Sequence, residues 1–216
     1  LQRRNAIKTK SMKWPNRTIV YQLDSSLCKK YIVLKTVCFD ITFSDEYEAN
    51  IEKAIKEIEE KSCVRFQKRV TEHNFVRIFN GPACAADIGY EARPEQMVSL
   101  KIPNCMCHSL ILHELMHTLG FVHMHSRSDR DDYIKIHWEN INVSDRGRFI
   151  RFRPHQSENL TPFDFDSVML YGNTSYSKDK KSFTMTSLDG SKIIEVCEKP
   201  GLSHNDVLAI NKLYDC

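Results

Sequence analysis

The sequence predicts an α+β fold with a mixed sheet, and two features of the pattern predict it. Short runs rich in β-branched and aromatic residues alternate with longer stretches whose apolar residues recur at helical spacing. The composition supports a large core, because 41% of the 216 residues are apolar and 27% are charged. The sequence has no internal repeat, linker or low-complexity segment. We therefore expect a single domain over residues 1–216.

Three segments have the composition of strands. They are residues 18–23 (TIVYQL), 75–80 (FVRIFN) and 96–102 (QMVSLKI). Gly and Pro residues mark the connection between the second segment and the third. Because these strands alternate with predicted helices, we expect them to form a mixed sheet.

The first predicted helix spans residues 45–62. It places Ile51, Ile55 and Ile58 on one face and charged side chains on the remaining face. Ser44 precedes it and is the expected N-cap. This pattern is typical of a surface helix that packs on a core.

Two further helices are expected. The segment SLILHELMHTLG, which ends at Gly120, has a helical pattern, whereas residues 126–200 are rich in loops and show little periodicity. Ser203 is expected to cap a last amphipathic helix over residues 203–214. The apolar face of this helix consists of Val207, Ile210, Leu213 and Tyr214.

The charge and the hydropathy argue against two classes of partner. A formal net charge of +3 is too small to imply a polyanion, and no apolar run approaches the roughly 20 residues of a membrane span. Residues 145–153 (DRGRFIRFR) alternate basic and aromatic side chains, which can bind nucleic acid or a sulfated matrix. We favour a half-exposed segment with solvated arginines and no nucleic-acid partner. The side chains concerned are Arg146, Arg148, Phe149, Arg151, Phe152 and Arg153.

The cysteines indicate an oxidising compartment. All 8 are scattered, without the repeated CxxC pairs of a structural zinc module, and this favours disulfides in a secreted, extracellular protein. Glycosylation sequons fit the same setting, although the sequence does not show which of them carry a glycan. They begin at Asn16, Asn142, Asn159 and Asn173.

The N-terminal residues indicate processing of a zymogen. The opening LQRRNAIK has no apolar core, so we expect no signal peptide in this chain. The dibasic pair Arg3-Arg4 resembles the end of a removed pro-segment. We therefore expect residues 1–4 to be a remnant of that segment and processing at or near Asn5.

Residues 113–125 (HELMHTLGFVHMH) hold four of the 9 histidines. His113 and His117 are four residues apart on a predicted helix, so their imidazoles project from one face and can share a metal ion. On a continuing helix His123 would lie about 9 Å further along the axis, too far to reach the same ion. Gly120 tolerates the left-handed conformation that ends a helix. We therefore expect the chain to turn there and to bring His123 to the metal.

Three neutral imidazole nitrogens leave one position of a zinc ion open to water, as in catalytic zinc sites. Glu114 is offset by about 100° from His113 on the helix, so we expect it to act as a general base and not as a ligand. Zinc lowers the pKa of its bound water to about 7, and the carboxylate can take the proton as the water attacks a carbonyl and then deliver it to the leaving amine. The pattern predicts hydrolysis of peptide bonds. Histidines with purely structural roles are the weaker interpretation, because the extended HExxHxxGxxH motif requires five identities in eleven positions.

These motifs resemble the astacin family of metzincin zinc endopeptidases. The matching segments are HELMHTLGF, SRSDRD, WENI, FDFDSVMLYG and the closing GLSHNDVLAINKLYDC, and the likeness runs from Asn5 to Cys216. It implies a metzincin (zincin-like) fold of two lobes. One is an N-terminal lobe (about 5–123) with a twisted mixed sheet and two long helices, and the other is an irregular C-terminal lobe (about 124–216) with a terminal helix.

The resemblance also implies roles that the residues alone do not suggest. Met169 would form the turn beneath the metal, and Tyr171 would be a further zinc ligand that swings away to stabilise the oxyanion. A protein or peptide substrate would lie extended in the cleft and pair with an edge strand, for which residues 96–102 are our candidate.

Disulfide pairs follow from the same resemblance. It implies Cys63 with Cys216 and Cys84 with Cys105. The other four cysteines exceed the family's minimum, and their connectivity stays open, including an exchange of Cys107 for Cys105. Our interpretation pairs Cys28 with Cys38 and Cys107 with Cys197.

Two positions depart from the family pattern. Met124 stands where astacins usually have a glutamate, which pairs with the buried ammonium group of the mature N-terminus. Because a thioether cannot pair with a charge, we expect the N-terminus of this chain not to be held in that way. Leu170 stands where a histidine is common.

Two other function classes stay open. A non-catalytic binding module that kept the fold is one, and Met124 is its best support. A metal-buffering or structural zinc protein is the other, and it needs a fourth protein ligand, either His125 or Tyr171. We interpret His125 as a loop residue that points elsewhere. The sequence does not show whether Lys178, Lys180, Lys181 or Lys192 forms a pocket for an acidic side chain.

Overall fold

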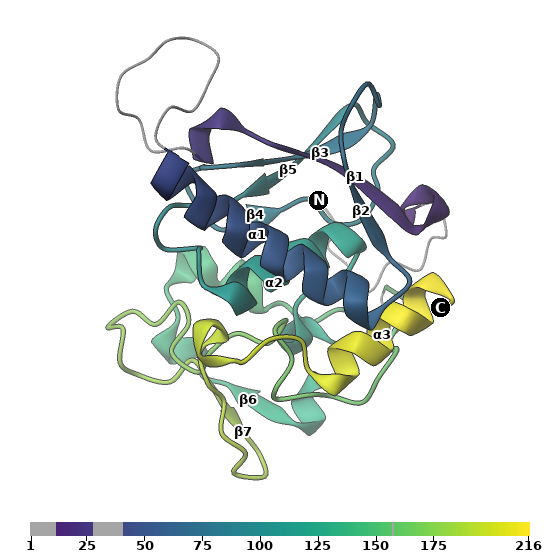
Figure 1. Cartoon of the computed structure of the whole chain (residues 1–216). Coiled ribbons are helices and arrows are strands. Elements are labelled where there is room, and N and C mark those ends of the chain that lie inside the picture. Colours follow the sequence, from purple (N-terminus) through teal and green to yellow (C-terminus); the bar gives the residue numbers. More distant parts are fainter. Residues whose placement is uncertain (1–11, 28–40, 157) are drawn as a thin grey trace.

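The computed structural model describes residues 12–27, 41–156 and 158–216. The Cys28–Cys38 pair and the processing site near Asn5 lie outside these residues. The described part, drawn in Figure 1 as a ribbon coloured along the sequence, contains a large sheet and three α-helices. Its buried apolar residues form two cores. The first core joins the large sheet to the three α-helices, and the second lies among the loops of the C-terminal half.

A five-stranded sheet forms the upper layer of the described part, in the order β2-β1-β3-β5-β4. Strands β1, β2, β3 and β5 are parallel, whereas β4 is antiparallel to β5, so the prediction of a mixed sheet is confirmed. The three predicted strands are also confirmed within a few residues. The bounds are β1 Thr18–Leu23, β2 Arg65–Lys68, β3 Phe75–Phe79, β4 Ala85–Ala86 and β5 Glu95–Ser99.

The candidate edge strand is not at the edge. Strand β5 lies between β3 and β4, and the two-residue strand β4 pairs with it at Ala85↔Ser99 and Ala86↔Val98. A strand of two residues is too short to show alternation in the sequence, which is why the prediction missed it. Among the described residues, the edge on this side of the sheet therefore belongs to β4.

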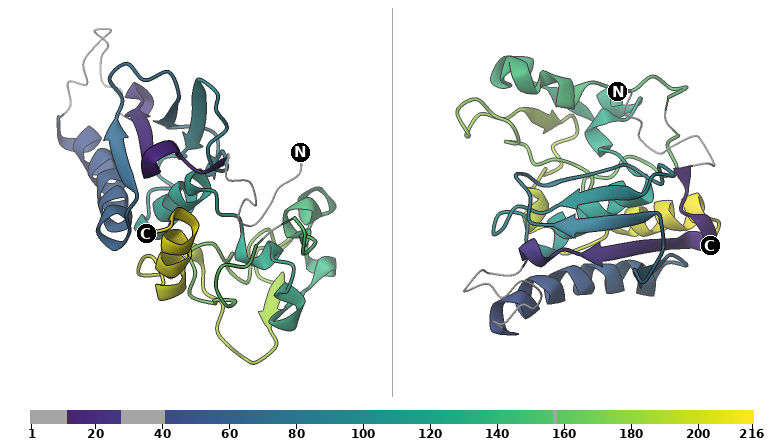
Figure 2. Two further views of the ribbon diagram at one scale, coloured as in Figure 1. Left: turned by 90° about the vertical axis from the view of Figure 1, so that its right-hand side faces the viewer. Right: turned by 90° about the horizontal axis from the view of Figure 1, so that it is seen from above.

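Two helices pack against each other and against the sheet (Figures 1 and 2). They are α1 (Ile41–Lys61) and α2 (His108–Leu119). Ile51 and Ile58 of α1 are fully buried, as the helical spacing predicted. Helix α1 begins four residues before the predicted start, so Ser44 lies inside it and is not its N-cap.

Helix α3 (His204–Tyr214) ends the chain and buries its apolar face in the first core. Ser203 caps it as predicted, because its hydroxyl accepts a hydrogen bond from the Asp206 N–H and the Asp206 carboxylate accepts one from the Ser203 N–H. Such a reciprocal cap satisfies two N–H groups that the helix leaves free.

The described cysteines form three disulfides. They join Cys63 to Cys216, Cys84 to Cys105 and Cys107 to Cys197. The first ties the end of α1 to the end of α3, across 153 residues of sequence. The third ties the start of α2 to the segment that precedes α3. The elements that carry the histidine motif are therefore covalently held to the C-terminal half.

The described residues between 126 and 200 are rich in loops, as predicted, and they also contain several short 3₁₀-helices. The second core includes residues of a two-stranded antiparallel sheet made of β6 (Ile134–Ile136) and β7 (Met185–Ser187). None of the described helices is long and apolar enough to cross a membrane.

Candidate metal centre

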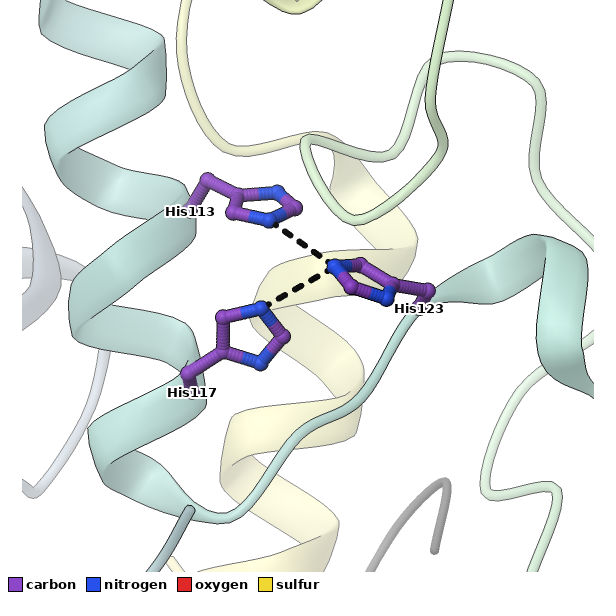
Figure 3. Close-up of side chains that lie close together, drawn as sticks. All are labelled: His113, His117 and His123. Carbon is purple, nitrogen blue, oxygen red and sulfur yellow. Dashed lines mark hydrogen bonds between the residues drawn. The ribbon is translucent and has the colours of Figure 1, made fainter. Parts of the chain in front are cut away.

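Helix α2 and the bend that ends it bring three histidines together. His113 and His117 lie one turn apart and are 4% and 6% exposed. Gly120 has φ 108°, and its N–H binds the carbonyl of His117, so the helix stops there. The chain then turns back and places His123 opposite the helix (Figure 3). The predicted stop and return are both confirmed.

The three Nε2 atoms converge on one point. The Nε2 of His123 lies 3.2 Å from that of His113 and 3.1 Å from that of His117 (Figure 3). A tetrahedral zinc ion with Zn–N bonds of about 2.0–2.1 Å separates its nitrogen ligands by about 3.3 Å. The two separations from His123 fit such an ion, and all three ligand atoms lie within 4.8 Å of one another.

The other ring nitrogens hold two of these imidazoles in the required tautomer. The Nδ1 of His113 lies 2.7 Å from the carbonyl oxygen of Val168, and the Nδ1 of His117 lies 2.7 Å from that of Phe121. A carbonyl can only accept, so each Nδ1 carries the hydrogen and each Nε2 presents a lone pair. Burial lowers the pKa of His113 well below its usual value, which keeps its ring neutral. Facing lone pairs repel each other without a cation, so this donor set fits a zinc ion.

Glu114 is the carboxylate of the site. It is 3% exposed and lines the same cleft as the three histidines. Its Oε2 has no hydrogen-bond partner in the part of the chain that the structure describes. Burial alone raises the pKa of this carboxyl group from 4.5 to about 8. A carboxyl group with such a pKa can exchange a proton near neutral pH.

Tyr171 lies beside the histidines. Its ring centroid is 4.3 Å from that of His123 and 6.3 Å from that of His113. Burial raises the pKa of its phenol well above the usual value, so the group keeps its hydrogen and can donate it. Met169 is 2% exposed and its carbonyl accepts the N–H of Met124 at 2.9 Å, so the turn that contains it contacts the segment just after His123.

The site opens into a cleft of about 730 Å³. Strand β4 forms one wall through Ala85 and Ala86. Arg148 and Arg151, from the segment we expected to be merely solvated, line the cleft as well. Each is already paired with a carboxylate, Arg148 with Asp145 and Arg151 with Asp131.

Sequence reasoning missed this role of the arginine segment, because only its alternation of basic and aromatic residues was visible. Phe149 is fully buried and anchors the segment, whereas Ile150 is 63% exposed. The lysines that we considered for an acidic pocket are not among the residues that line this cleft. They are Lys178, Lys180, Lys181 and Lys192.

His125 is not part of the converging set. Its Nε2 lies 3.1 Å from the carbonyl oxygen of Arg148, and the residue belongs to the short 3₁₀-helix Met124–Ser126, not to the loop that we expected. The ring is nevertheless fully buried, and its centroid lies 5.0 Å from that of His123 and 4.1 Å from that of Tyr171. His125 therefore packs behind the site.

The two departures from the family pattern lie in the second core. Met124 is 9% exposed, and its sulfur lies 3.6 Å from Nη1 of Arg127. Leu170 is fully buried. Residues 1–11 lie outside the described part, so the position of the N-terminus stays a prediction.

Three converging imidazoles beside a buried carboxyl group in an open cleft define a metal-dependent hydrolase. The family is shown by comparison with known sequences. The model of the family Astacin (Peptidase family M12A) matches residues 6–215, and the chain belongs to this family. It is a zinc metalloendopeptidase.

The relatives that match this chain include a toxin, a choriolytic enzyme and an astacin-like metalloendopeptidase. Astacin-like metalloprotease toxin 1 of Loxosceles intermedia is 36% identical over 99% of this chain and 75% of the toxin. The low choriolytic enzyme of Oryzias latipes is 39% identical over 80% of this chain and 64% of that enzyme. The astacin-like metalloendopeptidase of Gallus gallus is 35% identical over 99% of this chain, which spans 49% of that protein.

Solved structures agree with this assignment. High choriolytic enzyme 1, a hatching enzyme zinc-protease from Oryzias latipes, matches with a TM-score of 0.81 at 30% identity. The match covers 98% of this chain and 100% of that one. Myroilysin matches with a TM-score of 0.65 at 15% identity over 96% of this chain and 97% of its own, and this likeness shows the fold alone. The expected metzincin fold is confirmed.

Proposed function

We propose that this chain is a secreted endopeptidase that cleaves protein substrates with Glu114 as general base. The observation that carries the proposal is the position of a buried carboxyl group on the same cleft as three imidazoles whose Nε2 atoms lie close together. His113, His117 and His123 would hold the zinc ion. When bound there, zinc polarises a carbonyl oxygen and makes water a stronger nucleophile.

Glu114 would carry out both proton transfers of the reaction. Glu114 takes a proton from the attacking water and delivers it to the nitrogen of the leaving amine. Its pKa of about 8 in the zinc-free chain leaves it able to do both, and a nearby cation would lower that pKa.

Tyr171 would stabilise the negative charge that develops on the carbonyl oxygen. Its phenol lies beside His123 and stays protonated. A hydrogen-bond donor at this position acts where charge appears in the transition state, which is usually a large contribution to catalysis. We also assign Tyr171 as a further metal ligand in the resting site, as the family resemblance implies.

Substrate would lie extended along the cleft and extend the sheet at β4. The unpaired edge of β4 borders the cleft through Ala85 and Ala86. An extended peptide can bind such an edge through main-chain hydrogen bonds. We assign the pairing with substrate to β4 and not to β5, because β5 already pairs with β3 on one side and with β4 on the other.

Secretion, activation from a zymogen and glycosylation belong to the same proposal. The disulfides support an oxidising compartment. Among the sequons, Asn16, Asn142 and Asn159 are exposed, whereas Asn173 is partly buried. We further infer that the two lobes of this single catalytic domain divide near His123, because Phe121 belongs to the first core and Met124 to the second.

Hydrolysis of casein or a quenched peptide by the purified zinc-loaded chain tests the proposal. Replacement of Glu114 by Gln should lower kcat about 10²- to 10⁴-fold while zinc stays bound. Glu60→Gln is the matched control, because Glu60 is an exposed carboxylate on α1 and should leave kcat unchanged. Equal activity of wild type and Glu114→Gln would remove the assigned base. If both were inert with one zinc bound per chain, the alternative of a binding module would hold.

A further inference from the structure

One short turn contacts several parts of the candidate metal centre. Residues 167–170 offer the carbonyl of Val168 to Nδ1 of His113 at 2.7 Å. The carbonyl of Met169 accepts the N–H of Met124, which follows His123, at 2.9 Å. Leu170 directly precedes Tyr171. The position of this turn therefore affects two histidines and the tyrosine together.

A buried ammonium group holds the turn at both ends. The Nζ of Lys199 donates to the carbonyl of Ser167 at 2.5 Å and to that of Leu170 at 2.8 Å. Lys199 is only 4% exposed, and burial lowers the pKa of its ammonium group to about 8. Two charge-assisted bonds from one donor fix the distance between the two carbonyls.

A buried carboxylate holds the same turn from α3. Asp206 accepts the hydroxyl of Ser167 at 2.6 Å on one oxygen and the N–H of Val168 at 2.9 Å on the other. The Ser167 hydroxyl in turn accepts the N–H of Met169 at 3.1 Å. Asp206 is 3% exposed, and burial raises the pKa of its carboxyl group despite these hydrogen bonds. Every bond that Asp206 makes here fixes the backbone of the turn or the cap of α3.

Packing alone does not account for this pair of charges. Removing an ammonium and a carboxylate from water is costly, and apolar residues of similar volume would fill a core as well or better. Lys199 and Asp206 form no salt bridge within 4 Å of each other among the described residues, although the charge of Asp206 acts on Lys199 from further away. Their hydrogen bonds go to the turn. What they add is directional hydrogen bonding to particular backbone groups.

We infer that Lys199 and Asp206 are positioning residues for the metal centre, which clamp residues 167–170 so that Val168 orients His113 and Leu170 sets Tyr171. This inference rests on the proposed function only for its effect on catalysis. Groups that orient metal ligands in this indirect way typically contribute 10- to 100-fold to metal affinity or activity. Neither residue contacts the metal or the substrate.

The test compares Lys199→Met, Lys199→Arg and a matched control. Lys212→Met is that control, since Lys212 also donates to a carbonyl, that of Leu160, but lies on the exposed side of α3. Zinc release to a chelator at 25 °C and the separate values of kcat and KM are measured, with the melting temperature recorded alongside. We expect Lys199→Met to release zinc about 10-fold faster and to lower kcat about 10-fold, with KM within about twofold of wild type. Lys199→Arg should restore most of the zinc retention and most of kcat. Lys212→Met should change neither the zinc release rate nor kcat.

If Lys199 only stabilised the fold, the Lys199→Met variant would give a different combination of melting temperature and zinc release. If Lys199→Met lowered the melting temperature but released zinc and turned over substrate as wild type does at 25 °C, the inference would be overturned. If Lys199→Met failed to fold, Ser167→Ala would test the other arm, because it removes one bond to Asp206 and should release zinc faster. Unchanged release in that variant would count against the clamp. The zinc measurement also separates this inference from the proposed function, since it needs no proteolytic activity.

Discussion

Glu114 tests the electrostatics of the site, because its carboxyl group is buried with no compensating charge. Burial raises its pKa from 4.5 to about 8 in the zinc-free chain. A carboxyl group whose pKa rises on folding binds its proton more tightly in the folded state. The free energy of unfolding must therefore fall as the pH rises from 4.5 to about 8. Below pH 4.5 the burial of this carboxyl group does not lower the free energy of unfolding through ionisation. Above pH 8 it lowers the free energy of unfolding by the full amount.

The magnitude follows from the size of the pKa change. At about 1.4 kcal/mol for each pH unit, Glu114 costs about 3 kcal/mol at pH 7 and about 5 kcal/mol above pH 8. Glu114→Gln keeps the shape of the side chain and removes the charge. The zinc-free variant should thus be more stable than zinc-free wild type by about 3 kcal/mol at pH 7, and the difference should vanish at pH 4.

Urea unfolding of the chelator-treated proteins, with disulfides intact, measures this difference at several pH values between 4 and 8.5. The other buried titratable groups are present in both proteins, so their contributions cancel in the comparison. Glu60→Gln, which removes an exposed carboxylate from α1, is the control for the loss of one negative charge. A difference between wild type and Glu114→Gln that stays constant with pH, or that has the opposite sign, would refute the reasoning. Addition of zinc should shrink the difference, because the cation lowers the pKa of Glu114.

Three further predictions concern the same framework. Tyr171→Phe should lower kcat about 10²- to 10³-fold with the fold intact, as steady-state kinetics would show, and an unchanged kcat would exclude it as an oxyanion donor. Gly120→Ala should cost about 1–2 kcal/mol in urea unfolding, because φ is 108° there, and should weaken zinc binding by displacing His123; full zinc affinity would contradict this. Replacing Cys63 and Cys216 together by Ala should cost about 4 to 5 kcal/mol, because the disulfide closes a loop of 153 residues, and a melting temperature equal to that of wild type would show that the cross-link contributes nothing.

Features that depend on neighbours in the sequence were predictable. The four-residue spacing of His113 and His117 places both rings on one face of α2, and Gly120 ends that helix wherever the rest of the chain lies. Ser203 and Asp206 form a cap within a single turn of α3. The predicted start of α1 was wrong. Serine is a preferred N-cap residue, but the helical backbone of α1 extends past Ser44 back to Ile41.

The sequence by itself therefore determined the three imidazoles that we propose as zinc ligands, the carboxyl group beside them and the turn that joins them, because these lie within eleven consecutive residues. Only the tertiary structure decided which groups surround them. Val168 reaches His113 across 55 residues, and Lys199 reaches Leu170 across 29. The short strand β4 became the free edge only because β5 pairs on both sides. Contacts between distant segments arise when the cores form, and no local preference of the chain encodes which backbone carbonyl a buried side chain will meet.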